Sequence, residues 1–576
     1  MRSRRLVVLL GIVSLIGLTT LLLSRRQTNP PAFPPKVDVN NPVDHGAASK
    51  PSNLPESSHP IAGLMNSSES TLRIRLSQQS QTLSDAVKEY ERRYGMRPPP
   101  KFDVWFKFAQ DRGVQLIDEF DTIYHSILPF WGLPPKTIRD RAREAMGFDN
   151  VLICGMIRNG KVAQVIGGSD GQQWKRDALT GMIQTFVEHL PDMDLPFNIH
   201  DEPRVVLSSE DLQRLVTRAK DVSIPDSWNI RKPRNSFSSR PADVNKGDRL
   251  DEFRTTRFNR FAHQATWTHS RISCPVDSPS RDLDENREDD TSYALGELGF
   301  IQNITAFSDI CLSPSLRYTF GLFDRPNAVD LVHDLFPIFS ESKVSSYQDI
   351  LYPSPWYWAG KVTYDPKKDM PWESKKDQLY WRGSTTGGFS RAGGWRRQHR
   401  QLFVKDVNAI DGTKVLSKTS SGSWETKEAR RREYKSLFNV KFSHIGQCDP
   451  EDCDAQSSFF EVVKPDDQQA AWQYKYLLDM DGNAFSGRYF AFLQSNSLIY
   501  KLAIFREWHN EWLYPWVHYV PLSLKGDEHF ESVRYFAQEE EGQARAAYLA
   551  EQSQEWARKA LRNEDLEVWF FRLLLE

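Results

Sequence analysis

The residues best suited to chemistry lie in a loop that ends at Arg488. Residues 474–521 read as a strand, a loop, a helix and a strand, and small residues fill the loop before the arginine. A helix N-terminus presents unpaired N–H groups and partial positive charge, which suits an anion. A guanidinium adds paired donors for a phosphate. The segment therefore predicts a site for a phosphate-bearing molecule.

A second turn of this kind follows the strand-like residues 379–381. It runs from Arg382 through Ser384 into two glycines, and a basic helix is expected after it. Two strand–turn–helix units predict a parallel, Rossmann-like sheet. Neither turn matches the GxGxxG or GxxxxGK[ST] pattern, so nothing points to NAD or ATP.

Carboxylates surround a short strand expected at residues 195–200. They are Asp192, Asp194, Asp201 and Glu202. A carboxylate whose pKa is raised by partial burial can act as a general base, and such residues also cap helices and turns. Residues 192–194 and 479–481 both read Asp-Met-Asp, a pattern that can hold a divalent metal on a diphosphate. For the second copy, turn residues beside Gly482 are the favoured alternative.

The aromatic run at residues 352–358 has two interpretations. Tyr352, Trp356 and Trp358 can stack on a sugar, or they can pack in the core. His518 alternates with apolar residues on an expected strand, so we expect it in the core. The same is expected of Trp508, Trp512 and Trp516.

Length and composition narrow the class of protein. The chain has 576 residues, 39% of them hydrophobic, which predicts two domains with large cores. The net charge of −2 argues against a general polyanion binder, so no nucleic-acid partner is expected.

The N-terminal region predicts membrane attachment. Residues 6–23 are uncharged and apolar, which is long enough for a signal anchor behind a cytosolic tail at residues 1–5. A cleaved signal peptide is the alternative. Residues 24–83 are rich in Pro, Ser and Asn and predict a disordered stem. Asn66 and Asn303 begin N-glycosylation sequons. We therefore expect a single-pass type II protein of the Golgi or ER membrane with a lumenal catalytic domain.

The five cysteines predict up to two disulfides. Cys448 and Cys453 are close enough to bridge a local loop, and Cys274 and Cys311 can close another. Cys154 lies in an apolar, strand-like run and is expected to be a buried thiol.

Six segments, taken in order, resemble glycosyltransferase family 90, which includes fungal capsule-associated xylosyltransferases and animal protein O-glucosyltransferases. They are YGMRPPP (94–100), PDMDLPFNIHDEPRV (191–205), DILYPSPWYW (349–358), LYWRGSTTGG (379–388), KYLLDMDGNAFSGR (475–488) and LYPWVHYVP (513–521). The resemblance extends over about residues 84–550. It implies an α/β fold of the GT-B type, in which two Rossmann-like domains face a cleft, and inverting transfer from a nucleotide sugar.

The resemblance also implies roles for individual residues. Asp192 is the implied catalytic base, with Asp194 and Asp201 as alternatives, and Tyr352, Trp356 and Trp358 are acceptor-side candidates. The implied donor-binding residues are Arg382, Ser384, Asn483, Ala484, Phe485, Ser486, Gly487 and Arg488. No metal is expected to be obligatory, although Mn²⁺ is compatible with the pattern.

The expected domains follow from these assignments. Residues 84–360 form the acceptor-side domain, and residues 361–576 bind the UDP-sugar and end in helices. The favoured function is transfer of xylose, or next glucose, from a UDP-sugar to a glycan. The alternatives are a protein O-glucosyl- or O-xylosyltransferase that acts on Ser or Thr, and a membrane-anchored glycan-binding protein without catalysis.

Overall fold

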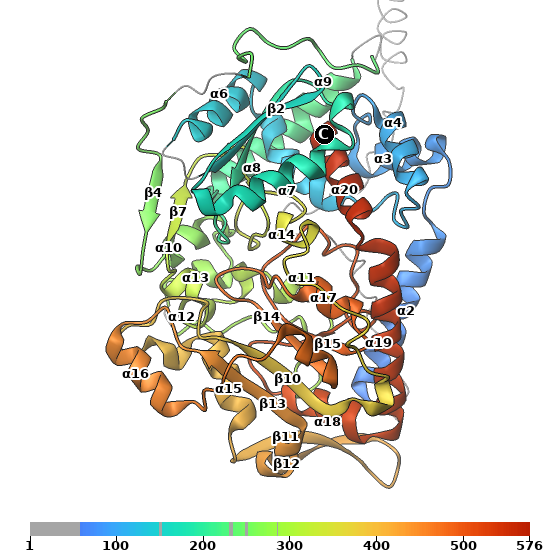
Figure 1. Ribbon diagram of the computed structural model, residues 1–576, viewed down its shortest axis with the longest axis vertical. Helices are drawn as coiled ribbons and strands as arrows, with labels where there is room; N and C mark the ends of the chain where they lie inside the picture. Colours follow the sequence, from blue (N-terminus) through green and yellow to red (C-terminus); the bar gives the residue numbers. More distant parts are fainter. Residues whose placement is uncertain (1–57, 149–151, 230–233, 248–251, 285) are drawn as a thin grey trace, which may run out of the picture.

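The computed structural model describes residues 58–148, 152–229, 234–247, 252–284 and 286–576. The expected cytosolic tail and signal anchor, residues 1–5 and 6–23, lie outside these ranges. Within them, no helix is both long and apolar enough to cross a bilayer. Figure 1 shows the described chain as two halves stacked along the long axis, each with its own sheet.

The first half contains a mixed five-stranded sheet in the order β2-β1-β3-β8-β9. The strands are β1 (Leu152–Arg158), β2 (Lys161–Gly167), β3 (Met193–Asn198), β8 (Phe339–Ser340) and β9 (Ile350–Leu351). β1 pairs antiparallel with both β2 and β3, while β3, β8 and β9 run parallel. The hairpin turn between β1 and β2 contains Asn159 and Gly160, both with positive φ, as the Asn-Gly pair predicts.

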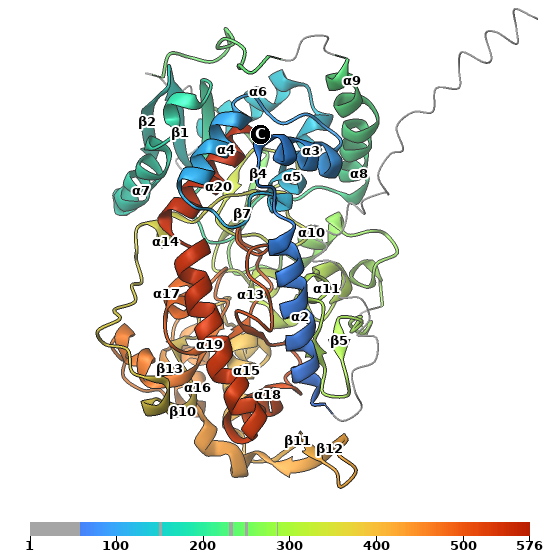
Figure 2. The same cartoon turned by 90° about the vertical axis from the view of Figure 1, so that its right-hand side faces the viewer.

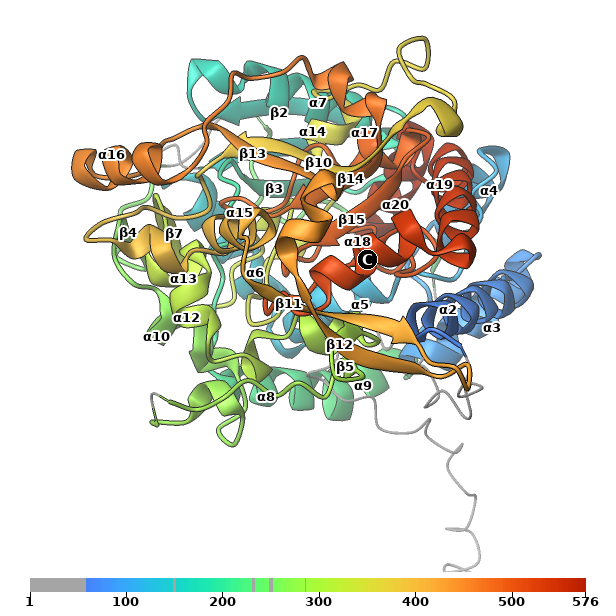
Figure 3. The same cartoon turned by 90° about the horizontal axis from the view of Figure 1, so that it is seen from below.

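The second half contains a wholly parallel sheet in the order β13-β10-β14-β15-β16. The strands are β10 (Lys376–Ser384), β13 (Phe438–His444), β14 (Tyr474–Met480), β15 (Leu498–Leu502) and β16 (Val520–Pro521). In chain order this is 2-1-3-4-5, a doubly wound sheet whose direction of winding switches between β10 and β14. Figure 3 shows β13, β10, β14 and β15 side by side. The predicted parallel, Rossmann-like sheet is confirmed.

Helices cover both sheets. The longer ones are α2 (Pro60–Ser77), α3 (Leu83–Tyr94), α4 (Phe102–Asp111), α6 (Pro135–Met146), α7 (Gln173–Gln184), α8 (Ser209–Arg218), α15 (His399–Asn408), α16 (Pro450–Phe459), α18 (His529–Gln538), α19 (Glu540–Ala560) and α20 (Asn563–Leu575). Shorter helices used below are α5 (Asp121–Ile127), α11 (Ile304–Phe307), α14 (Pro355–Trp358) and α17 (Tyr489–Gln494). A hairpin of β11 (Gly412–Lys418) and β12 (Trp424–Arg430), absent from the sequence-based expectations, lies at the lower end of the molecule (Figure 1).

The predicted disordered stem at residues 24–83 needs a correction at its carboxyl-terminal end. Residues 60–77 form α2, which lies alongside α19 (Figure 2). Ile61 and Met65 are buried, and Arg545 and Tyr548 of α19 bond to side chains of α2. The Pro and Ser content predicted a flexible segment. The apolar side chains of α2 instead pack in the hydrophobic core of the second half, and this packing stabilises the helix.

The last helix, α20, returns to the first half of the molecule. Trp569, Phe570 and Phe571 are fully buried. Phe571 stacks on Phe186 at a ring distance of 4.8 Å, and the Trp105 indole donates to the Val568 carbonyl at 3.0 Å. This packing of the terminal apolar residues ties the two ends of the described chain to one core.

The cysteines behave as the sequence predicts. Disulfides join Cys274 to Cys311 and Cys448 to Cys453. Cys154 is a buried free thiol whose pKa burial raises to about 12. His518 is buried and stacks on Trp556, and desolvation lowers its pKa to about 3, so it is a core histidine as expected. Trp508, Trp512 and Trp516 are also buried.

Candidate functional site

The loop that ends at Arg488 lies at the point where the parallel sheet switches its direction of winding. It leaves the carboxyl end of β14 beside the carboxyl end of β10. In open α/β sheets, ligands bind beyond the carboxyl ends of the strands at such a switch point. The fold therefore indicates the same two loops as the sequence does. They are residues 481–488, called the donor loop below, and residues 384–388, called the β10 loop.

Arg488 supplies half-buried positive charge to this point. Its Nη1 donates to the Arg382 carbonyl at 2.6 Å, and within the described ranges no carboxylate oxygen lies within 4.0 Å of its guanidinium nitrogens. Burial lowers the pKa of Arg488, and the charge of Asp479 opposes that effect. The helix expected after it is α17, which is only six residues long. The guanidinium, and not a long helix, is thus the group here whose chemistry suits an anion, and its role in donor binding stays a prediction.

Arg400 is a second cation at this point and is buried, and sequence reasoning missed it. It extends from α15 and donates to the Asp481 carbonyl (2.8 Å) and the Met480 carbonyl (3.1 Å). It also donates to the Thr386 hydroxyl at 3.0 Å, which joins the two loops. Burial lowers its pKa to about 9, and Arg488 is the next cause. The run of basic residues at 396–400, directly after the β10 loop, was the available signal.

The two loops hold each other in place. The Asn483 side chain accepts from the Gly387 N–H at 3.1 Å, and the Ser384 and Thr386 hydroxyls are 2.8 Å apart. Gly387 has φ of +111°, where a side chain would be strained, and Gly482 leaves room for Arg400 Nη2 only 2.9 Å from where a Cβ would be. Ala484 and Ser486 are buried, and Phe485 is half-buried against Tyr357.

The side chain of Arg382, which the resemblance assigns to donor binding, bonds to other parts of the protein. Its Nη1 donates to the Asn439 carbonyl at 2.8 Å, and its Nε is 3.1 Å from an Asp466 carboxylate oxygen. The side chain therefore braces β10 against β13, and only its carbonyl contacts Arg488. Its role in donor binding stays a prediction.

The second Asp-Met-Asp pair is built into the sheet. Asp479 pairs with Lys501 at 2.9 Å, and Asp481 accepts from the Ile504 and Phe505 N–H groups at 2.7 and 3.1 Å. Burial raises the pKa of Asp481 to about 7. No group of three or more metal-ligating side chains occurs in the part of the chain that the structure describes. Binding of Mn²⁺ together with a donor stays a prediction.

Asp192, the predicted base, lies at the amino end of its strand, β3, and the donor loop contacts the chain at the opposite end. Asp192 comes directly before β3, where it accepts from the Asn159 N–H at 2.6 Å and pairs with Arg240 at 3.1 Å. The next carboxylate, Asp194, pairs with Arg158 at 2.6 Å. The donor loop contacts the residues that follow the other end of this sheet. Six residues of extended chain separate the two ends by roughly 20 Å. Asp192 and Asp194 thus both have local structural partners, and the catalytic role of Asp192 stays a prediction.

Asp201, the remaining alternative, lies beyond the carboxyl end of β3. Its carboxylate is solvent-accessible, and its pKa is raised by desolvation and by the charge of Glu341, against the effect of Lys175. Glu341 pairs with Lys175 at 2.6 Å and accepts from the Ser354 hydroxyl. The adjacent Glu202 is buried, and burial raises its pKa to about 8.

A short path of hydrogen bonds leads from Glu341, whose charge acts on Asp201, to the donor loop. Ser354, which bonds to Glu341, accepts from the Trp356 N–H at 3.1 Å at the start of α14. The Trp356 indole then donates to the Gly487 carbonyl at 3.1 Å, and the Tyr357 hydroxyl donates to the Ser486 carbonyl at 3.0 Å. The carboxyl ends of the two sheets thus meet at α14, which Figure 1 shows between the two halves.

The three aromatic candidates have separate roles. Tyr352 is fully buried against Phe197 and Phe570, so it is a core residue and not an acceptor platform. The Trp358 indole bonds to Glu567 of α20 at 3.2 Å and covers Gly181, which anchors the last helix. Trp356 alone touches the donor loop. The sequence could not distinguish these roles, because all three residues are aromatic and lie within one short segment, residues 352–358.

Comparison with known proteins identifies the part of the chain that carries this site. Residues 314–576 match the family model described as Glycosyl transferase family 90. This part of the chain belongs to glycosyl transferase family 90. The resemblance inferred from the motifs is confirmed there, and it includes both loops and Arg400. The segments at 94–100 and 191–205, with Asp201, lie outside the matched range.

Curated proteins that are similar to this chain are O-glucosyltransferases by name. O-glucosyltransferase rumi of Drosophila melanogaster is 26% identical over 244 residues, covering 41% of this chain and 53% of the relative. Protein O-glucosyltransferase 1 of Homo sapiens is 22% identical over 289 residues, covering 46% and 62%. The rumi homologue of Anopheles gambiae is 26% identical over 259 residues, covering 41% and 54%. The chain spans between half and two thirds of the length of these relatives.

Proposed function

We propose that this protein is an inverting glycosyltransferase with a GT-B arrangement, which moves a sugar from a UDP-sugar to a hydroxyl group of an acceptor. The observation that carries the proposal is the pair of guanidinium groups at the switch point of the parallel sheet, buried Arg400 and half-buried Arg488. Neither has a carboxylate partner among the described residues, so no ion pair neutralises either charge. Membership of family 90 over residues 314–576 supports the same reaction class.

The proposed step is a single displacement. The acceptor hydroxyl oxygen forms a bond to C1 of the donor sugar as the bond from C1 to the diphosphate oxygen breaks. The UDP leaves with the electron pair of that bond, and Arg488 and Arg400 stabilise the developing negative charge. The hydroxyl proton passes to a carboxylate, for which we choose Asp201 in place of Asp192.

The choice of Asp201 rests on position and on charge. It follows β3 at the sheet end that contacts the donor loop through Trp356, and its carboxylate is accessible. Its pKa is raised by desolvation and by Glu341, which makes it a stronger base than an ordinary aspartate. Trp356, half-buried beside Gly487, is the aromatic residue that we retain as an acceptor-side candidate.

The names of the relatives favour a protein hydroxyl as acceptor and glucose as donor sugar. These are protein O-glucosyltransferases by name, so this alternative now precedes transfer of xylose to a glycan. Two disulfides and two exposed sequons at Asn66 and Asn303 support a compartment of the secretory pathway. We retain the Golgi or ER membrane as the proposed location, with the apolar residues 6–23 as anchor.

The direct test is turnover of a panel of UDP-sugars by the purified protein, with and without Mn²⁺. We expect release of UDP from UDP-glucose or UDP-xylose, and transfer with inversion to a serine-containing folded peptide or to a glycan. Binding of glycan without binding of any nucleotide sugar would instead support the non-catalytic alternative and contradict the proposal.

A further inference from the structure

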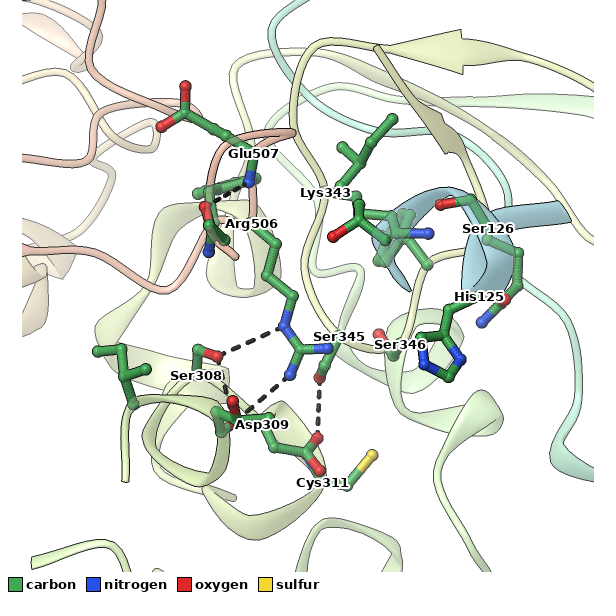
Figure 4. Close-up of a pocket in the computed structure, with 18 of the residues that line it drawn as sticks. His125, Ser126, Ser308, Asp309, Cys311, Lys343, Ser345, Ser346, Arg506 and Glu507 are labelled. Carbon is green, nitrogen blue, oxygen red and sulfur yellow. Dashed lines mark hydrogen bonds between the residues drawn. The ribbon is translucent and has the colours of Figure 1, made fainter. Parts of the chain in front are cut away.

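A cavity of about 390 Å³ lies behind the donor loop, between the two halves of the chain. Its walls come from α5, from residues 304–312, from residues 343–351 and from residues 501–519. Figure 4 shows that Lys343, Arg506, His125, Ser345 and Ser346 gather around it. The volume is within the range of small-molecule sites, ~300–1,000 Å³. None of the groups assigned to sugar transfer above is among these five residues.

Lys343 and Arg506 put two positive charges side by side in its wall. Each residue donates its backbone N–H to the carbonyl of the other, at 3.0 and 2.7 Å, so they lie directly opposite on an antiparallel bridge. Side chains of such a pair extend to the same side. Burial lowers the pKa of Lys343 to about 8, the charge of Asp349 opposes that shift, and repulsion from Arg506 adds to it. Like charges opposite each other are unfavourable unless an anion compensates them.

The cavity itself offers little compensation. Within the described ranges, neither Lys343 nor Arg506 has a carboxylate oxygen within 4.0 Å. Arg506 makes only long bonds, 3.4 Å to the Ser308 hydroxyl and 3.4 Å to the Thr305 carbonyl. Lys343 donates to the Asp349 carbonyl at 2.8 Å. Asp309 is near enough to favour the charge of Arg506, but its carboxylate accepts from the Ser345 hydroxyl at 2.8 Å and the Cys311 N–H at 3.0 Å. The charge of Asp349 likewise favours that of Lys343, but its carboxylate accepts from the Ser340 hydroxyl and the Val205 N–H. Both carboxylates that act on these cations are thus already hydrogen-bonded.

A buried polar group in the same wall also lacks a partner. Ser346 is 3% exposed, and its hydroxyl has no hydrogen bond within the described structure. His125 extends into the same space from α5 (Figure 4), and desolvation holds its pKa near 4, so it is neutral at physiological pH. A neutral imidazole and a free hydroxyl can donate to or accept from the hydroxyl groups of a ligand. A buried polar group without a hydrogen-bond partner costs free energy, so these groups indicate a bound molecule.

We propose that this cavity binds a monosaccharide that carries an acidic group, a carboxylate or a phosphate. Arg506 and Lys343 bind the oxyanion, and Ser346 and His125 bind the sugar hydroxyls. The site lies apart from the donor loop and does not depend on the proposed transfer reaction. A bare phosphate would fill only a small part of the cavity and would leave Ser346 and His125 without partners.

Calorimetric titration of the full chain with glucuronate, glucose 6-phosphate, inorganic phosphate and glucose tests this site. All titrations use the same ionic strength, set with NaCl. We expect saturable heat from glucuronate or glucose 6-phosphate, at least tenfold weaker binding of inorganic phosphate, and none of glucose. The stronger of the two sugar anions identifies the acidic group.

Substitutions in the cavity wall test whether the sugar anion binds in this cavity. Lys343→Gln and Arg506→Gln should each weaken binding at least tenfold, whereas Lys414→Gln, at an exposed cation paired with Glu297, should not. UDP binding should be unchanged in Lys343→Gln, which separates the cavity from the donor loop. If Arg506→Gln does not fold, Lys343→Gln decides. Absence of binding by both sugar anions, or binding that is undiminished in Lys343→Gln, would overturn the proposal.

Discussion

The Trp356 indole of the first half donates to the Gly487 carbonyl of the second half at 3.1 Å. This bond joins the helix that follows the first sheet to the loop that holds Arg488. A hydrogen-atom side chain is required at Gly487, because a Cβ there would overlap Trp356 Nε1. Together with the bond from the Tyr357 hydroxyl to the Ser486 carbonyl, this contact sets the position of the donor loop relative to the first half.

The substitution Gly487→Ala tests this dependence. The added methyl group must displace Trp356 and break its bond to the loop, so we expect UDP binding to weaken at least tenfold. The free energy of unfolding should fall by about 1–3 kcal/mol, the usual effect of an overpacked site. Gly412→Ala is the matched control, because nothing lies within 4 Å of a Cβ at that position. Equal UDP affinity in Gly487→Ala and the wild type would show that the contact does not position the loop.

Asp201→Asn and Asp192→Asn separate the two candidate bases. Removal of a general base costs about 10²–10⁴-fold in rate. We expect Asp201→Asn to lower kcat by that factor while UDP binding stays unchanged, because the carboxylate does not touch the diphosphate. Asp192→Asn should keep kcat within a few-fold and lose only its ion pair with Arg240. Steady-state transfer assays measure both. The reverse pattern would return the role to Asp192.

Buried Asp481 predicts a pH dependence of stability. Its pKa is about 7 in the folded protein, first because of desolvation, against a usual value of 3.8. The folded state therefore holds a proton that the unfolded state has already released, so stability falls as pH rises from about 4 to about 7. One pKa unit corresponds to about 1.4 kcal/mol, so the loss should exceed that value.

Urea unfolding at pH 4.5 and pH 8 measures this effect. The fall in free energy of unfolding should be smaller in Asp481→Asn, which keeps an acceptor for the Ile504 N–H but cannot ionise. Exposed Asp411, whose pKa Arg431 lowers, is the control, and Asp411→Asn should not reduce the fall. An Asp481→Asn protein with the same pH dependence as the wild type would contradict the assignment.

Local patterns predicted much of the second half of the fold. The apolar strands, the glycines between them and the cysteine spacing led to the parallel sheet, the donor loop and both disulfides. They did not predict Arg400, because its contacts with residues 480–481 depend on how α15 packs across the sheet. The rule that sites lie beyond the carboxyl ends of strands favours Asp201 over Asp192, and the motif resemblance obscured it. The cavity at Lys343 and Arg506 could not be predicted, because its lining comes from many segments that are far apart in the sequence.

The most direct test of the account is calorimetric titration of UDP into the wild type, Arg488→Gln and Arg400→Gln. A charged hydrogen bond contributes about 1.5–3 kcal/mol, so each substitution should weaken UDP binding about tenfold to a hundredfold or more. Arg391→Gln, at an exposed arginine paired with Asp449, should bind UDP as the wild type does. If the wild type binds UDP and neither of these two arginines affects the affinity, the donor is not held at the switch point between β10 and β14, and the central claim fails.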